Sequence, residues 1–439
     1  MLSNLPRSFR PGGLQRFATD GRILSFKCCT EGSILATGVT WSTNSRLRCM
    51  STVSVPTCPP ANLLKPMSFP MKLLMGPGPS NCPPRVLSAS ALPMLGHLHP
   101  EFTQIMDDVK DGIKYGFQTD NIWTVCVSGS GHGAMETSVC NLIEAGDKVM
   151  VCVNGLWGER FSDMADRHGA NLSKIDKPMG TVFSLEEIEK GLQDNQPEIM
   201  FITHGESSGT TVQQLQGLGQ LCHRYNCILI VDSVAAMGGV PLFMDQWEID
   251  VLYTGAQKVL SAPPGVSPIS FSNRARQKVE NRKTKVRSYY FDMKELANYW
   301  GCDNEPRRYH HTGLISSVYA LREGFARLAE VGLEQSWTTH TQCMQQLHAG
   351  IGDLGLELFV KEKSARLPCV TGIVVPEDIH WKDVSDYAMK NYRVEISGGL
   401  GAQAGKIWRI GLMGYNCTDS NVTLVLRALS EALDHVRNK

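Results

Sequence analysis

The stretch VDSVAAMGGVPLFMDQWEIDVLYTGAQKVLSAPPG, residues 231–265, contains two apolar runs, each followed by a charged side chain. Asp232 closes the run 228–231, and Lys258 follows the run 251–257. Short apolar runs of this kind are typical of buried strands in a parallel sheet. Because taking a lone charge out of water is costly, a carboxylate and an amine at such strand ends need a partner, which is either each other or a bound charged group.

The chain around this stretch alternates between short apolar runs and longer amphipathic segments. Residues 123–146 and 147–170 each predict a strand, a turn and a helix, and residues 198–209 predict a strand with a polar loop after it. Residues 213–236 predict a helix and then a strand, which the strand in 249–260 follows. This alternation predicts an α/β fold with a mostly parallel sheet covered on both faces by helices.

The pattern changes after residue 310. Helical periodicity extends over 316–355, and three short strand candidates follow within 367–376, 392–401 and 406–414. A length of 439 residues also favours more than one core. We expect a linker and N-terminal arm over 51–71, a large domain over 72–331, and a smaller C-terminal α/β domain over 332–439.

The first fifty residues differ in composition from the rest. They contain seven Lys or Arg and six Ser but only two acidic residues, Asp20 and Glu31. An Arg- and Ser-rich, acid-poor N-terminus is typical of a mitochondrial transit peptide, so we expect residues 1–50 to direct the protein to the mitochondrial matrix. The alternative is a tail without an address, and a product that starts at Met50 would be peroxisomal or cytosolic.

The whole-chain composition argues against several classes of protein. The formal net charge is zero, which does not favour nucleic acid or an anionic membrane surface as a partner. The sequence has no run of 18 or more apolar residues. Its 14 cysteines are scattered, without a Cys-x-x-Cys pair or the Cys/His spacing of a zinc site, so we expect reduced thiols and no metal.

Polar residues collect where the predicted strands end, the edge at which parallel sheets bind ligands. These residues are Ser130, His132, Trp157, Ser207, Asp232 and Lys258. The segment SGSGHGA, residues 128–134, follows a strand and opens a helix, so its free N–H groups suit a phosphate. A glycine cluster of this kind is otherwise an ordinary turn.

Lys258 and Asp232 form the most informative pair. Burial lowers the pKa of a lysine and makes it a nucleophile toward a carbonyl carbon. An aspartate can pair with a protonated pyridine nitrogen, and the indole of Trp157 can stack on the ring. Together with the phosphate cradle, these residues predict pyridoxal 5′-phosphate as the cofactor. The simpler interpretation of the pair, a buried salt bridge, leaves the cradle and the indole unexplained.

A second motif suggests different chemistry. GESSG, residues 205–209, matches the Gly-x-Ser-x-Gly nucleophile elbow of α/β-hydrolases, with Ser207 as the nucleophile. That motif requires a strand, a sharp turn and then a helix. The following residues, TTVQQLQGLG, begin with β-branched and polar side chains, which do not favour an immediate helix. A serine hydrolase therefore stays an alternative.

Eight motifs occur in an order that resembles one enzyme family. They are LLMGPGPSN (73–81), SGSGHGAME (128–136), NGLWGER (154–160), THGESS (203–208), VDSVAAMGG (231–239), YTGAQKVLSAPPG (253–265), YHHT (309–312) and GGLG…GKIWRIGLMG (398–414). The chain from about residue 60 to its end resembles the alanine–glyoxylate/serine–pyruvate aminotransferases, which belong to the class V branch of fold-type I pyridoxal-phosphate enzymes.

The resemblance implies a role for each matching residue. Lys258 would hold the cofactor covalently and then move the substrate proton, Asp232 would bind the pyridinium nitrogen, and Trp157 would stack on the ring with Ser207 near the phenolic oxygen. The phosphate would be held by Ser130, Gly131, His132 and Gln257. Tyr309 and Thr312 are similar to residues that reach the phosphate of the neighbouring subunit, which implies a homodimer. Arg409 would bind the substrate carboxylate.

The activity that the resemblance implies is transamination from L-alanine or L-serine to glyoxylate or pyruvate, with glycine formed from glyoxylate. A cysteine desulfurase of the same fold would need a reactive cysteine on a mobile loop, and Cys302, Cys343, Cys369 and Cys417 offer no obvious candidate. One departure from the family is visible. The expected order after HGESS is Thr-Gly, whereas this chain has Gly209 and then Thr210.

Overall fold

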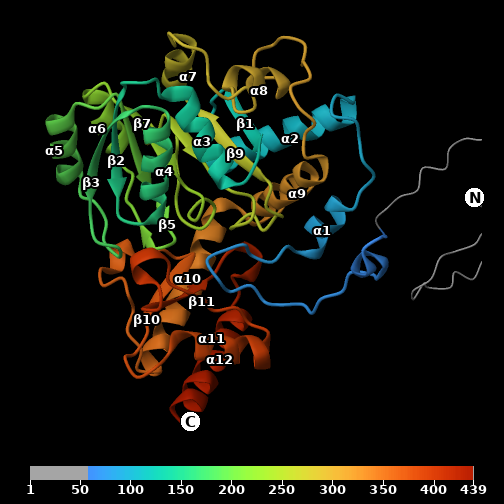
Figure 1. Ribbon diagram of the computed structural model, residues 1–439, viewed down its shortest axis with the longest axis vertical. Coiled ribbons are helices and arrows are strands. Elements are labelled where there is room, and N and C mark those ends of the chain that lie inside the picture. The colour runs from blue at the N-terminus through green and yellow to red at the C-terminus, as the bar shows by residue number, and fades with distance from the viewer. Residues whose placement is uncertain (1–57, 439) are drawn as a thin grey trace, which may run out of the picture. The chain divides into compact units, whose positions relative to one another are not determined.

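The computed structural model describes residues 58–438 (Figure 1). The chain divides into two units, with the division after Ser68. The described part of the first contains one short 3-10 helix, η1 (Ala61–Leu64). The expected transit segment, residues 1–50, lies outside the described residues, as does part of the expected linker. No helix within 58–438 combines the length and the apolar character that crossing a membrane requires.

A seven-stranded sheet forms the centre of the second unit. Its strands, in spatial order, are β1 (Trp123–Ser128), β9 (Val266–Phe271), β8 (Val251–Tyr253), β7 (Ile228–Asp232), β4 (Ile199–Thr203), β2 (Lys148–Val153) and β3 (Asn171–Asp176). Strand β9 alone runs antiparallel to its neighbours, β1 and β8. The prediction of a mostly parallel sheet is therefore confirmed, although the sequence did not lead us to expect β9.

The central strands are buried on both faces. Every residue of β4, β7, β8 and β9 is buried, and alternate residues of a strand point to opposite faces of the sheet. Helices therefore cover both faces, as the apolar runs predicted. The edge strand β3 instead consists of exposed and half-buried residues. Helices α3 (Gly131–Leu142), α4 (Leu156–Arg167) and α6 (Leu218–Arg224) follow the strand–helix order that the sequence predicted.

One strand prediction was wrong in its extent. The apolar run before Lys258 forms a strand only over β8, and the chain leaves the sheet at Thr254. Lys258 therefore lies in the loop between β8 and β9, five residues beyond the strand end. The backbone turns here because β9 must return antiparallel beside β8. Periodicity within a short apolar run could not show this turn.

The C-terminal strands form a separate sheet. β10 (Val370–Val374), β12 (Ile407–Gly411) and β11 (Ser397–Gly398) are antiparallel and lie in that order. The long helical segment is broken at Gly332, whose φ of 83° separates α9 (Ile315–Val331) from α10 (Leu333–Asp353). Helices α11 (Trp381–Tyr392) and α12 (Asp419–Arg437) pack on each other. Strands β10–β12 and helices α11 and α12, orange to red in Figure 1, gather apart from the large sheet, whereas α9 packs against α1 (Pro84–Ser90) and α2 (Pro100–Phe117).

The buried apolar residues follow the same division. One core surrounds the seven-stranded sheet, and a second core includes Trp408 of β12 with Leu347 of α10 and Leu429 of α12. The boundary that we placed between residues 331 and 332 stays a prediction. The remaining helices are α5 (Leu185–Asn195), α7 (Asn273–Glu280) and α8 (Met293–Tyr299), and the remaining strands are β5 (Gly205–Glu206) and β6 (Thr211–Val212).

Candidate active site

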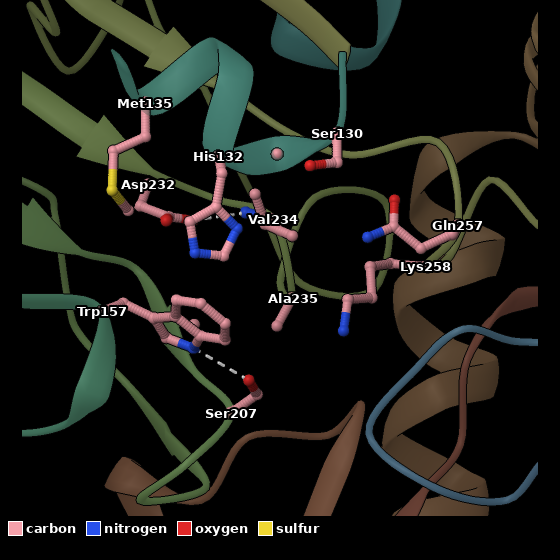
Figure 2. Close-up of a pocket in the computed structure, with 12 residues that line it drawn as sticks. Ser130, His132, Met135, Trp157, Ser207, Asp232, Val234, Ala235, Gln257 and Lys258 are labelled. Carbon is pink, nitrogen blue, oxygen red and sulfur yellow. Dashed lines mark hydrogen bonds between the residues drawn. The ribbon is translucent and has the colours of Figure 1, made fainter. Parts of the chain in front are cut away.

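A cavity of about 160 Å³ lies beyond the carboxyl ends of the parallel strands (Figure 2). Eight of the residues that the sequence singled out line it: Ser130, Gly131, His132, Trp157, Ser207, Asp232, Gln257 and Lys258. They come from the last residue of β7 and from the segments after β1, β2, β4 and β8. The fold thus brings together side chains separated by as many as 128 positions, because parallel strands end at one edge of the sheet.

Asp232 is the last residue of β7 and is only 3% exposed. Its Oδ1 accepts a hydrogen bond of 2.8 Å from the Val234 backbone N–H, and its Oδ2 accepts one of 3.0 Å from the Tyr253 hydroxyl. Burial raises the pKa of this carboxyl to about 6, and the two hydrogen bonds oppose that rise. A cation in the cavity would stabilise the ionised form further.

The Lys258 amine points into the same cavity (Figure 2). The side chain is 8% exposed, and its Nζ donates to the backbone oxygen of Pro77. Burial, and then the positive charge of Arg409, lower the pKa of Lys258 to about 8, while Asp232 acts in the opposite direction. A substantial fraction of this amine is therefore neutral, and hence nucleophilic, near physiological pH.

Trp157 and Ser207 form one wall of the cavity. The indole Nε1–H donates to Ser207 Oγ over 3.0 Å, which fixes the plane of the indole (Figure 2). The ring of His132 lies edge-on to the indole, with 5.5 Å between the ring centroids. A flat aromatic ligand therefore meets a fixed aromatic surface, with a hydroxyl beside it.

The opposite part of the cavity suits an anion. Helix α3 begins after Ser130 without a side-chain cap, and although the Gly133 N–H donates to the Ser130 backbone oxygen, the N–H groups of Gly131 and His132 remain available. Gln257 lines the same cavity, and its side-chain oxygen is buried without a hydrogen-bond partner. The NH2 group of this amide is the donor that an anion requires. The cavity therefore fits each part of pyridoxal phosphate. The anion-binding groups suit its phosphate and the indole suits its ring. Asp232 suits the pyridine nitrogen, and Lys258 suits the carbonyl carbon.

Arg409 does not line the cavity but reaches its edge. It lies on β12, is 4% exposed, and donates from Nη1 to the Ser207 backbone oxygen at 3.0 Å and from Nε to the Gly398 backbone oxygen at 2.9 Å. Burial lowers its pKa to about 10, so the guanidinium stays charged at neutral pH. The remaining N–H groups are suited to a carboxylate.

Tyr309 and Thr312 lie away from the cavity of their own chain. Both are exposed, and their hydroxyls are 3.1 Å apart. Neither lines the cavity, which is the placement expected of residues that serve a second copy of the chain. Their contact with a neighbouring subunit stays a prediction.

The segment around Ser207 does not form a nucleophile elbow. Residues Gly205–Glu206 pair antiparallel with Thr211–Val212, so a hairpin stands where a hydrolase requires a helix. Thr210 in this hairpin has a φ of 58°, a left-handed conformation that is unfavourable for a β-branched residue. The order Gly209–Thr210 therefore places threonine where the family order would place glycine.

Comparisons with known proteins agree with this geometry. Residues 74–423 match the family model described as aminotransferase class-V. The chain is also 52% identical over 393 residues to the alanine–glyoxylate aminotransferase of Callithrix jacchus, an alignment that covers 90% of this chain and 95% of the relative. This chain belongs to the class V aminotransferase family. It is a pyridoxal-phosphate-dependent aminotransferase of fold type I.

Solved structures give the same fold. The crystal structure of alanine–glyoxylate aminotransferase from Nostoc sp. matches with a TM-score of 0.82 and 42% identity, covering 84% of this chain and 97% of that one. A cysteine desulfurase from Thermococcus onnurineus matches with a TM-score of 0.66 and 13% identity, covering 83% and 95%, which shows the fold alone. The four cysteines considered for desulfurase chemistry, Cys302, Cys343, Cys369 and Cys417, are all buried.

Several residues of the site were missed by sequence reasoning. Tyr253 holds the Asp232 carboxylate, and the Pro77 carbonyl accepts from Lys258. A Cβ on Gly78 would collide with the Lys258 side chain, so this glycine of the LLMGPGPSN motif gives the lysine its space. Glu206 is buried and accepts hydrogen bonds from the backbone N–H of Trp157 and of Ser208. The motif matches could have suggested these residues, but their roles depend on non-local contacts.

Proposed function

We propose that this aminotransferase moves the amino group of L-alanine, or L-serine, to glyoxylate, or pyruvate. Alanine and glyoxylate would give pyruvate and glycine, so the enzyme would remove glyoxylate. The observation that carries this proposal is the convergence of Asp232, Lys258 and Trp157 in one cavity, with Arg409 at its edge. The relative at 52% identity, named alanine–glyoxylate aminotransferase, supports the choice of donor and acceptor.

Pyridoxal phosphate, when bound, supplies an electron sink for the pair of electrons released at the substrate Cα. Lys258 would first hold the cofactor and, once displaced by the incoming amino acid, take the Cα proton on its Nζ and deliver it to C4′ of the cofactor. Its lowered pKa suits this role, because a base with a pKa near the working pH both accepts and returns a proton.

The other residues would position and polarise the cofactor. Asp232 would pair with the pyridinium nitrogen, Trp157 would stack on the ring and orient Ser207 toward the phenolic oxygen, and Ser130, Gly131, His132 and Gln257 would bind phosphate. Arg409 would hold the substrate carboxylate as a bidentate pair. Its hydrogen bonds to Ser207 and Gly398 limit its side-chain motion, which favours a single substrate orientation.

The active form would be a homodimer with Tyr309 and Thr312 completing the phosphate site of the partner subunit. The exposure of both hydroxyls and their distance from their own cavity support this arrangement. The basic, acid-poor first fifty residues support delivery to mitochondria. Expression of residues 1–50 fused to a fluorescent protein would test the address, and cytosolic fluorescence would contradict it.

The visible absorption spectrum of the purified enzyme tests the reaction. We expect a yellow band that bleaches on addition of L-alanine and returns on addition of glyoxylate, since the cofactor stores the amine between the two half-reactions. Lys258→Ala should abolish both the band and its cycle. A colourless protein that pyridoxal phosphate cannot reconstitute would overturn the proposal.

A further inference from the structure

A chain of hydrogen bonds runs through the two buried histidines of the segment Tyr309–Thr312. Ser128 Oγ and His311 Nε2 are 2.7 Å apart, His311 Nδ1 and His310 Nδ1 are 2.8 Å apart, and His310 Nε2 and the backbone oxygen of Tyr289 are 2.9 Å apart. His311 is 9% exposed and His310 is 7% exposed. None of these residues lines the cofactor cavity.

The acceptor at one end sets the order of the protons when both rings are neutral. The Tyr289 carbonyl only accepts, so His310 carries a proton on Nε2, and a neutral His310 ring then leaves its Nδ1 as an acceptor. His311 must therefore donate from Nδ1, which leaves its Nε2 to accept from the Ser128 hydroxyl. Burial and the neighbouring imidazoles of His310 and His97 lower the pKa of His311 to about 4, in agreement with a neutral His311 ring.

The chain of hydrogen bonds joins two parts of the phosphate machinery. Ser128 ends β1, two residues before Ser130, where the anion cradle begins. At the other end, the histidines are the buried pair within the segment 309–312, whose outer members Tyr309 and Thr312 are exposed. The histidines therefore connect that segment to the end of β1, directly before the phosphate cradle of the same chain.

We propose that His310 and His311 are positioning residues that hold Tyr309 and Thr312 in the orientation required by the phosphate of the partner subunit. This inference rests on the proposed homodimer. In that dimer, β1 of one subunit leads into the phosphate cradle of its own subunit. Through the histidines it also supports Tyr309 and Thr312, which donate to the phosphate in the partner subunit. A loosened segment would release the cofactor faster, while the residues that perform the proton transfer would stay unchanged.

Substitution at the start of the chain of hydrogen bonds gives the first test. Ser128→Ala removes one hydroxyl and leaves His311 Nε2 without a donor. We expect pyridoxal phosphate to dissociate about tenfold faster from this holoenzyme, the effect of one lost buried hydrogen bond. His311→Phe should increase the rate further, whereas His311→Asn, which keeps a donor toward His310, should restore part of the retention. The phosphorus-31 resonance of the bound cofactor should broaden in the same order.

Matched variants separate this inference from the dimer proposal. His348→Phe removes a half-buried histidine elsewhere in the chain, whose Nε2 is hydrogen-bonded to Thr371 Oγ1, and should leave cofactor release unchanged. Tyr309→Phe and Thr312→Ala should accelerate release if these groups bind the partner's phosphate. Faster release in those two variants, with unchanged release in Ser128→Ala and His311→Phe, would overturn the positioning role alone. Unchanged release in Tyr309→Phe and Thr312→Ala, or a monomer by sedimentation, would overturn the proposed dimer site.

The protonation pattern gives a readout that does not depend on activity. Nitrogen-15 spectra of histidine-labelled enzyme, assigned by comparison with His310→Asn and His311→Asn, should show both rings neutral. His310 should carry its proton on Nε2 and His311 on Nδ1. A charged ring, or a proton on Nε2 of His311, would contradict the chain of hydrogen bonds from which the inference was drawn.

Discussion

Tyr253 and Asp232 face each other on neighbouring parallel strands, and the Tyr253 hydroxyl donates to Asp232 Oδ2 at 3.0 Å. A second donor, the Val234 N–H, holds the other oxygen. The carboxylate is therefore oriented before any cofactor arrives. Its burial nevertheless makes the ionised form costly, because two neutral donors replace only part of the lost hydration.

Asp232→Asn should stabilise the apoenzyme at pH 7.5. The pKa of Asp232 is about 6 in the folded protein, against 3.8 for the free group, so the folded state binds more protons between these values. Stability then falls as the pH rises from about 4 to about 6, and the full penalty applies above that range. Removing the charge should increase the free energy of unfolding by about 2–3 kcal/mol, because each pKa unit corresponds to about 1.4 kcal/mol.

Urea unfolding of both apoenzymes at pH 7.5 and pH 4 measures this effect. The advantage of Asp232→Asn should shrink toward zero at the lower pH, while its affinity for pyridoxal phosphate should be reduced at neutral pH. If the wild-type apoenzyme were the more stable of the two at pH 7.5, the surrounding groups would already offset the cost of burying the Asp232 carboxylate.

The rate at which apoenzyme captures pyridoxal phosphate should follow the neutral fraction of Lys258. The amine attacks only without its proton, so the rate should rise about tenfold per pH unit below pH 8 and level off above it. Replacing Arg409 with Gln removes a positive charge that lowers this pKa, so the midpoint should move upward. Stopped-flow absorbance measures the rate, and a midpoint near pH 10 in the wild type would show that burial of the lysine is not retained in solution.

Arg409→Lys should raise the KM for L-alanine about 10- to 100-fold while the yellow band persists. Lysine keeps the charge but loses the planar fork and one of the hydrogen bonds to Ser207 and Gly398. Steady-state kinetics at fixed glyoxylate check the result. Arg427→Lys on α12, which exchanges an exposed arginine paired with Glu431, serves as the control and should leave the KM unchanged. Equal KM values in wild type and Arg409→Lys would assign the substrate carboxylate to another group.

Thr210→Gly should stabilise the protein by about 0.5–1 kcal/mol. Relief of the left-handed strain at a φ of 58° is worth about 1–2 kcal/mol, and the added freedom of glycine in the unfolded chain offsets part of it. The buried Thr210 Oγ1, which has no hydrogen-bond partner, is removed as well. Thermal unfolding of the holoenzyme checks the change.

The double variant Gly209→Thr with Thr210→Gly restores the order of the family and shows whether that order gives the same gain in stability. A lower melting temperature in Thr210→Gly would mean that the Thr210 side chain has a packing role.

The sequence alone determined the α/β class, the mostly parallel sheet and six of the eight cavity residues, whereas Gly131 and Gln257 were assigned to the site through the family resemblance. These inferences succeeded because they depend on local information: a buried strand shows as a short apolar run, and polar residues after several such runs must meet at one edge of the sheet. The motifs around Asp232, Lys258 and Arg409 then indicated the family. Even the separate C-terminal sheet followed from three short apolar runs.

Only the tertiary structure decided the features that depend on residues far apart in the chain. The antiparallel return of β9 shortens β8 and places Lys258 in a loop, where the Pro77 carbonyl and the space above Gly78 receive its amine. Tyr253 lies beside Asp232 because of strand register, and Ser128 meets His311 across 183 positions of sequence. Such contacts arise from the packing of whole elements, and no periodicity within one segment encodes them.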